Sequence, residues 1–207
     1  MSKIELKCQG LPCPQPVLQC KKAVEESDPQ TLIVHVDNQP ACENTTRFLT
    51  SKGYSVTSES KNKNFIVTAQ KDGEATPSEQ TDKIKAASPT GIEEDKHAIC
   101  VFISTDVLGN GDDELGSKLM FNFLATLPEL GEKLWRIILV NGAVRLAVEG
   151  SSALRQLQLL EQSGVSILVC GTCLEFFDIL DKKQVGQTTN MLDVVTSLEL
   201  AQKIIKI

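Results

Sequence analysis

Hydrophobic and polar residues recur with two different periods along the first 70 residues, and the two periods predict strands and helices in turn. The predicted strands cover residues 4–8, 31–36, 54–57 and 65–69. The predicted helices cover residues 17–26 and 40–52. The order strand, helix, strand, helix, strand, strand predicts an α/β domain, a two-layer βαβαββ sandwich with two helices on one face of a small mixed sheet.

The second half of the chain follows a different pattern, because its strands are almost continuously apolar, as parallel strands buried on both faces tend to be. The predicted strands cover residues 98–103, 135–140 and 165–169, and the predicted helices cover 113–127, 152–162 and 191–203. Four apolar residues recur at every fourth position of the first of these helices: Leu115, Leu119, Phe123 and Leu127. This alternation predicts an open, mostly parallel α/β sheet with flavodoxin-like layering.

Residues 71–97 separate the two patterns and have no apolar period, since they are charged, small and interrupted by proline. Such a composition is typical of a flexible linker. We therefore expect an N-terminal domain over 1–70 and a C-terminal domain over 98–207. A tether of this kind keeps two sites at high effective concentration without fixing their geometry.

Composition narrows the class of protein. The 207 residues are 41% hydrophobic and 23% charged, which is ordinary globular usage and enough for two small domains. The net charge of −6 argues against a nucleic-acid partner, which calls for a basic surface. No run approaches about 18 consecutive apolar residues, so we expect no membrane span and a cytoplasmic protein.

The cysteines are the residues that suggest chemistry. Seven of them are spread along the chain: Cys8, Cys13, Cys20, Cys42, Cys100, Cys170 and Cys173. An odd number at irregular spacing disfavours a disulfide framework and favours free or reactive thiols. Only the last pair has metal-ligand spacing, and the two histidines supply no second pair, so zinc is disfavoured. We expect neither a metal nor a cofactor.

The proline-rich stretch from Leu11 to Pro16 sets Cys13 at the mouth of the first helix. Proline lacks an N–H and has a helix-like φ, so Pro14 suits the first helical position and Cys13 the cap. The free backbone donors there favour a thiolate and predict a lowered pKa. The alternative, that Cys13 is an ordinary small residue in a tight turn, stays open on these residues alone.

Two further cysteines lie on predicted helices of the same domain. The helical period places Cys20 on the apolar face with Val17 and Val24, which predicts a core position. Cys42 lies in the first turn of the second helix, where burial competes with a place near Cys13. The second possibility arises because parallel strands bring both helix starts to the same end of the sheet.

Cys170 and Cys173 form a CxxC motif that leaves a buried strand and enters a helix. In an open parallel sheet the ligand crevice lies beyond the carboxyl ends of the strands. Four segments are expected to meet there: residues 104–112, 141–145, 170–173 and 188–190. A thiolate is favoured near the helix start, whereas the alternatives are a buried core thiol with a chance neighbour and a thioredoxin-like pair.

The first domain resembles the TusA/SirA family of small sulfur carriers. The resemblance covers residues 3–70 and rests on Cys13-Pro14-Gln15-Pro16, on Lys21-Lys22, and on Asp37 before Pro40-Ala41. It implies that Cys13 accepts a sulfane sulfur as a persulfide and passes it on. The implied donor is a cysteine desulfurase or another sulfur donor protein.

The second domain, residues 98–207, resembles the DsrE family, in which a cysteine occupies the same strand-to-helix turn as Cys170. Sulfur-relay members often carry arginine after that cysteine, where this chain has residues 174–177, Leu-Glu-Phe-Phe. Cys173 is an addition whose implied role is to resolve a persulfide or to form a redox disulfide with Cys170. The fusion of the two domains is similar to the YedF proteins, described as sulfurtransferase-like and linked to selenium metabolism.

These resemblances predict a sulfurtransferase-like carrier of sulfur or selenium with Cys13, Cys170 and Cys173 as its catalytic residues. Its partners would be sulfur donor or acceptor proteins and, by analogy with relatives, further copies of the same chain. Two alternatives remain open. One is a non-enzymatic ligand-binding or regulatory protein with an oligomerising second domain, and the other is a redox module at the CxxC pair.

Overall fold

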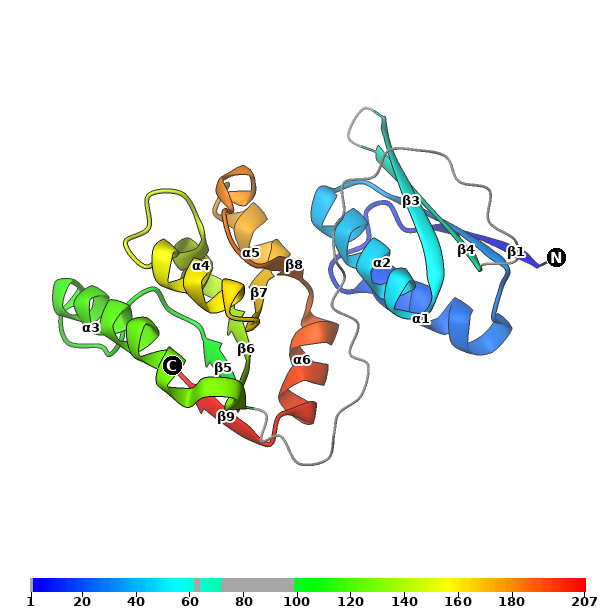
Figure 1. Cartoon of the computed structure of the whole chain (residues 1–207). Coiled ribbons are helices and arrows are strands. Elements are labelled where there is room, and N and C mark those ends of the chain that lie inside the picture. The colour runs from blue at the N-terminus through cyan, green and yellow to red at the C-terminus, as the bar shows by residue number, and fades with distance from the viewer. Residues whose placement is uncertain (1, 62–63, 72–98) are drawn as a thin grey trace. The chain divides into compact units, whose positions relative to one another are not determined.

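Two separate sheets organise the chain in the computed structural model, which describes residues 2–61, 64–71 and 99–207 (Figure 1). One unit covers residues 1–92 and the other 93–207. The linker expected over 71–97 lies outside the described residues, apart from Lys71, which ends a strand. Each unit is therefore described by itself.

The first unit is built around a four-stranded mixed sheet. Its elements are β1 (Lys3–Lys7), α1 (Gln15–Ser27), β2 (Thr31–Val36), α2 (Gln39–Ser51), β3 (Tyr54–Lys61) and β4 (Asn64–Lys71). The strand order is β1-β2-β4-β3, in which β1 and β2 are parallel and the other pairs antiparallel. The two helices pack on one face (Figure 1), which confirms the predicted two-layer sandwich.

Alternation along β2 sets the core of this unit, because every second residue of the strand is buried against the helices. The buried apolar residues include three cysteines: Cys8, Cys20 and Cys42. The core position predicted for Cys20 is confirmed, and so is burial for Cys42. Burial raises the pKa of all three thiols, to about 12 for Cys20, so they stay protonated at neutral pH.

The second unit is built around a five-stranded parallel sheet of order β8-β7-β6-β5-β9. Its strands are β5 (Ile99–Ile103), β6 (Leu134–Leu139), β7 (Ser166–Cys170), β8 (Gln187–Thr189) and β9 (Lys203–Lys206). Its helices are α3 (Asp113–Thr126), η1 (Leu127–Lys133), η2 (Asn141–Ala147), α4 (Leu154–Gln162), α5 (Gly171–Phe176), η3 (Leu180–Lys182) and α6 (Met191–Leu200). The predicted open parallel sheet is confirmed.

Both faces of this sheet are covered, which explains its nearly continuous apolar strands. A large cluster that includes Met120 and Leu124 of α3 and Leu157 of α4 covers one face. A smaller cluster with Val194 of α6 covers the other, and Figure 1 shows α3 and α6 on opposite sides of the sheet. The layering therefore has helices on both faces, as in doubly wound folds.

The chain after Asn190 differs from its prediction. Asn190 caps α6 through the N–H groups of Leu192 and Asp193, as the sequence suggests. The helix ends at Leu200, however, and not at Lys203, because Ala201 is extended and Lys203–Lys206 pairs with β5. Strands β8 and β9 have three and four residues. Such lengths are too short to show an alternating period.

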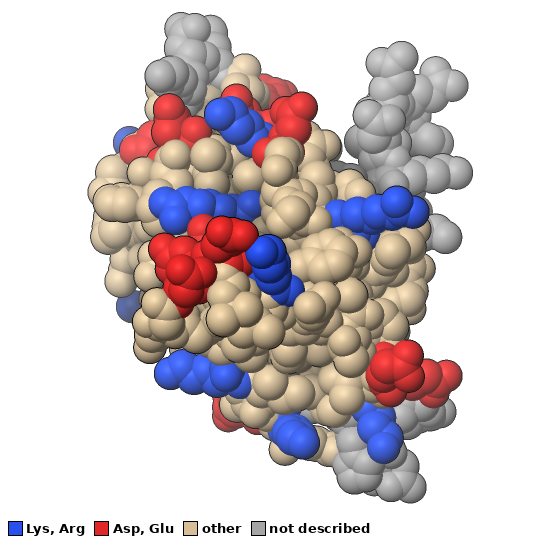
Figure 2. Space-filling view, turned by 90° about the vertical axis from the view of Figure 1, so that its left-hand side faces the viewer, with Lys and Arg blue, Asp and Glu red and all other residues tan. Residues whose placement is uncertain are grey.

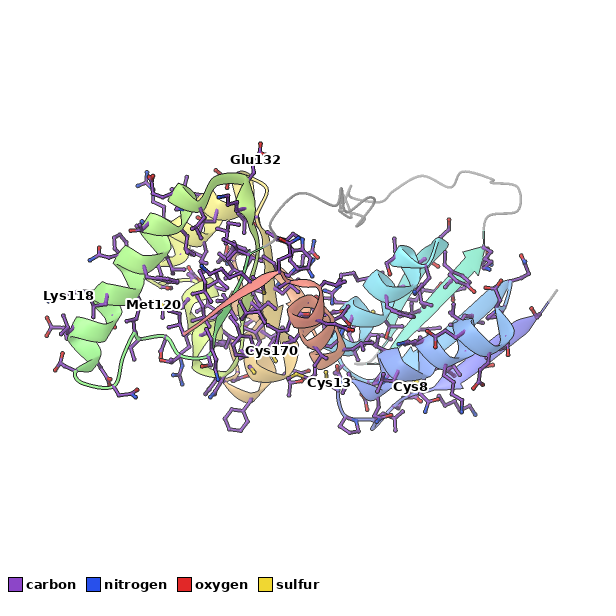
Figure 3. The ribbon with its side chains drawn as sticks, turned by 90° about the horizontal axis from the view of Figure 1, so that it is seen from below. Cys8, Cys13, Lys118, Met120, Glu132 and Cys170 are labelled. Carbon is purple, nitrogen blue, oxygen red and sulfur yellow. The ribbon has the colours of Figure 1, made fainter. Side chains whose placement is uncertain are left out.

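Helix α3 also differs from the pattern that predicted it. Its buried residues are Gly116, Met120 and Leu124, whereas Leu115 and Leu119 are 55% and 41% exposed. Figure 3 shows Met120 on the side of α3 nearer the sheet and Lys118 on the outer side. Gly116 permits this rotation, since a Cβ there would come within 2.9 Å of Val107 Cβ.

The buried thiol of Cys100 gives the second unit a predictable response to alkaline pH. Burial raises its pKa from 9.0 to about 11, while nearby Arg136 lowers it. Because the folded state holds this proton more tightly than the unfolded chain, its stabilisation is complete below pH 9 and is lost as pH rises through about 11.

We predict that the free energy of unfolding, followed by the fluorescence of the lone Trp135, falls by up to about 1.4 kcal/mol per pH unit above pH 9 through this thiol alone. A Cys100→Ala variant should show a flatter profile, and Cys13→Ala should show the wild-type slope. Equal slopes for wild type and Cys100→Ala would contradict the assignment.

Candidate functional site

Cys13 lies in the exposed loop between β1 and α1. Helix α1 begins at Gln15 with Pro14 as its cap residue, so the prediction of Pro14 as first helical residue and Cys13 as cap was wrong by one position. The cause is a turn in which the Gln15 N–H donates to the Pro12 carbonyl, and the first helical bond then joins Leu18 N–H to Pro14. Cys13 stands immediately before the cap.

The loop that carries Cys13 is tied to the next strand and helix. The Cys8 N–H donates to the His35 carbonyl at 2.8 Å, and the Gly10 N–H donates to the Asp37 carboxylate. Gly10 has a φ of +73°, a left-handed conformation that glycine adopts at low cost. Asn38 donates to the other oxygen of Asp37 at 3.0 Å. An exposed thiol therefore stands on a fixed loop.

Asn38 joins this loop to the start of α2, since its side-chain oxygen accepts the Ala41 N–H at 2.8 Å and caps the helix. The parallel pairing of β1 and β2 places the starts of α1 and α2 at the same end of the sheet, as the crossover rule requires. Sequence reasoning missed the role of Asp37 as the acceptor for Gly10. An aspartate directly after a strand and a glycine in the facing loop were the only signals for it.

The second candidate group lies at the carboxyl end of β7. Cys170 is the last residue of that strand and is 7% exposed, whereas Cys173, in α5, is half-buried. The backbone N–H of Asn141, at the start of η2, donates to Cys173 Sγ at 3.1 Å. Asn141 has a φ of +49°, so its backbone is in the left-handed region. Figure 3 shows Cys170 inside the second unit.

A second contact joins η2 to the end of α5. It is made by Arg145 of η2 and Phe177, the residue that follows α5. The Arg145 guanidinium lies 4.2 Å from the centre of the Phe177 ring and 3.5 Å from Asp106 Oδ2. Guanidinium groups stack well on aromatic faces and keep their N–H edges for other partners. Sequence reasoning named the segments of Arg145 and Asp106 but assigned no role to either residue.

The predicted crevice segments come together as follows. Residues 141–145 contact both 170–173 and 104–112 through the bonds just described, and Thr189 pairs with Cys170 in the sheet. All four segments therefore follow or end parallel strands at one edge. The structure brings Cys170 and Cys173 into this edge, while Cys13 belongs to the other unit.

Within 2–61, 64–71 and 99–207, no three His, Cys, Asp or Glu side chains gather so as to hold a metal ion. Over the same described residues, every helix is too short or too polar to cross a bilayer.

A family model matches part of the chain. Residues 4–71 match the family described as sulfurtransferase TusA. Comparison with curated proteins gave no match. The matched range includes β1, the Cys13 loop and Asp37, and it ends with β4.

Three solved structures are similar in part. The YchN protein from E. coli has 17% identity and a TM-score of 0.43, with 53% of this chain and 99% of that chain covered. A SirA-like protein from Desulfitobacterium hafniense has 29% identity and a TM-score of 0.30, with 32% and 93% covered. A conserved protein of unknown function from Bacteroides thetaiotaomicron has 17% identity and a TM-score of 0.42, with 56% and 99% covered.

Cys13, which is exposed on an anchored loop, lies inside the matched residues 4–71. Residues 4–71 of the N-terminal unit are therefore similar to the sulfurtransferase TusA family.

Proposed function

We propose that this protein carries sulfane sulfur as a persulfide on Cys13 and relays it through Cys170 and Cys173. The observation that carries the proposal is the exposure of Cys13 on an anchored loop inside the TusA-matching range. The Cys13 thiolate attacks the outer sulfur of a donor persulfide. A new S–S bond forms at Cys13, the donor S–S bond breaks, and the donor leaves as a thiolate.

The second unit serves as the acceptor or the release site in this proposal. Its pair at the edge of the sheet contains a thiol that is partly exposed and accepts a backbone N–H. DsrE-like and YedF-like roles for the unit remain part of the proposal. Selenium, transferred as a zero-valent atom to give Cys13–S–SeH, is the alternative cargo, and a redox pair or a ligand-binding module is the alternative role.

The partners follow from the chemistry of a carrier. A donor such as a cysteine desulfurase must supply the sulfur, and an acceptor protein or small molecule must remove it. We place the protein in a reducing compartment such as the cytoplasm, because exposed thiols stay reduced there.

Loading of sulfur tests the proposal directly. After incubation of the full chain with a cysteine desulfurase and cysteine, peptide mass spectrometry should find one added sulfur atom on the Cys13 peptide. Cys13→Ala should abolish the addition in the first unit, and Cys42→Ala should not, because Cys42 is buried. Absence of sulfur on Cys13, in a sample where another carrier is loaded, would refute the role.

Asp37 provides a test of the anchored loop. Asp37→Ala removes the acceptor for the Gly10 N–H and should slow Cys13 loading about tenfold, since hydrogen bonds to charged groups contribute about 1.5 kcal/mol. Asp37→Asn keeps a side-chain oxygen and should lie between the two rates. Glu43→Ala, on the nearby α2, is the control and should load normally. A normal rate for Asp37→Ala would show that the anchor is dispensable.

The proposal also includes self-association of the protein through its second unit. Leu115 and Leu119 of α3 and Leu159 of α4 are all more than two-fifths exposed, and Figure 2 shows wide uncharged areas on the face of the molecule that carries α3. Burying such residues against a second copy is favourable.

Leu119→Glu should therefore lower the molar mass measured by light scattering, while Ser117→Glu, a charge added on the same helix, should not. Identical masses for wild type, Leu119→Glu and Ser117→Glu would exclude α3 as the contact.

A further inference from the structure

The two thiols at the end of β7 differ in access. Cys170 is 7% exposed and packs in the main core cluster of the second unit. Cys173 is partly buried and packs at the margin of the same cluster. A sulfur donor approaching from solvent therefore meets the Cys173 sulfur first.

The Cys173 sulfur also has a fixed hydrogen-bond donor. The Asn141 N–H lies 3.1 Å from it and belongs to the backbone, so side-chain rotation does not move it away. The N–H therefore holds the Cys173 sulfur in one position towards an incoming sulfur donor. The left-handed conformation of Asn141 helps to hold the N–H in this direction.

A positive charge lies four residues further along η2. Arg145 follows Asn141 by four residues, and Phe177 follows Cys173 by four residues. The Arg145–Phe177 stack and the Asn141–Cys173 contact therefore join the same two segments at two places. Half of the Arg145 side chain is exposed, and its ion pair with Asp106 is long at 3.5 Å. Arg145 therefore places a cation on the segment whose first residue, Asn141, contacts Cys173.

We propose that Cys173 is the sulfur-accepting thiol of the second unit, that Cys170 is the resolving thiol, and that Arg145 is a positioning residue for the anion formed on Cys173. This reverses the roles that the resemblance to the DsrE family implies for the pair. It rests on the proposed function, because the sulfur arrives from a persulfide such as that of Cys13.

The reaction balances in two steps. The Cys173 thiolate attacks the outer sulfur of a donor persulfide, which forms Cys173–S–SH and releases the donor thiolate. The Cys170 thiolate then attacks Cys173 Sγ, so that a Cys170–Cys173 disulfide forms, the bond to the outer sulfur breaks, and hydrosulfide leaves with the electron pair. A dithiol reductant must reduce the disulfide before the next cycle.

The spacing of the two residues permits the second step. Cys170 is the cap residue of α5 and Cys173 is the third residue of that helix. Residues three apart on a helix have Cβ atoms about 5–6 Å apart. Disulfides need Cβ atoms about 3.5–4.5 Å apart, so the start of α5 must move by about 1–2 Å to bring the two sulfurs together.

Trapping variants test the order of the two thiols. The full chain is treated with inorganic polysulfide, which supplies sulfane sulfur without a donor protein, and its peptides are mapped. In Cys170→Ser, added sulfur should accumulate on Cys173. In Cys173→Ser, the Cys170 peptide should stay unmodified. Sulfur on Cys170 in Cys173→Ser, with none on Cys173 in Cys170→Ser, would overturn the assignment.

The release step has its own readout. After polysulfide has been removed, wild type should lose the added sulfur as hydrosulfide and form a matching amount of Cys170–Cys173 disulfide, whereas Cys170→Ser should keep the sulfur on Cys173 and form no such disulfide. Repeating both measurements in a Cys13→Ala background removes the first carrier, so that these results stand apart from the proposed function. Failure of the desulfurase to load Cys13 would refute the proposed function while leaving the order of the pair measurable.

Arg145 is tested by alkylation of Cys173 with iodoacetate and with neutral iodoacetamide. Arg145→Gln should slow both reactions several-fold and the reaction with the anion more, while Arg145→Lys should recover part of the rate. Arg155→Gln, an exposed arginine on α4, is the matched control. Unchanged Trp135 fluorescence verifies folding, and equal rates for Arg145→Gln and Arg155→Gln would contradict the positioning role.

Discussion

Parallel strand pairing is the constraint on which the rest of this structure depends. When consecutive strands are parallel, each must end at the same edge, and the segments that follow them meet there. In the first unit this edge carries the Cys13 loop and the start of α2. In the second unit it carries Asn141, Arg145 and the Cys170–Cys173 pair. Both candidate sites are thus consequences of one rule.

Burial then decides which thiols can meet a sulfur donor that comes from solvent. Cys8, Cys20, Cys42 and Cys100 pack in the cores, where loss of water raises the pKa of each thiol. These four behave as small apolar residues. Cys13 and Cys173 retain access to solvent, and each is held by backbone contacts of its own unit. Cysteine therefore has two roles in this chain, core packing and candidate chemistry. The residues that surround each cysteine decide which role it has.

The fold was largely predictable from the sequence, because alternation along β2 and the apolar runs of β5, β6 and β7 are strong local signals. The short strands β8 and β9 were missed, since their pairing depends on a sheet already formed. The buried face of α3 was also predicted wrongly. Leucine at every fourth position predicted the helix itself, but the close approach of Gly116 to Val107 sets which side of the helix faces the sheet.

The candidate site was predictable as a set of segments and not as a set of contacts. Proline spacing located Cys13 to within one residue of its place, and the CxxC motif located the second pair. The donation from Gly10 to Asp37 and the stack of Arg145 on Phe177 join residues far apart in sequence. Such contacts follow from the assembled edge of each sheet, for which no local pattern exists.

The central claim is that sulfur enters this protein on Cys13 and leaves through the second unit. Time-resolved peptide mass spectrometry of the full chain, after a single addition of desulfurase and cysteine, tests it most directly. The account predicts added sulfur on Cys13 first and on Cys173 later, with no sulfur on Cys173 in Cys13→Ala. Equal labelling of Cys173 in wild type and in Cys13→Ala, or labelling that never reaches Cys13, would contradict it.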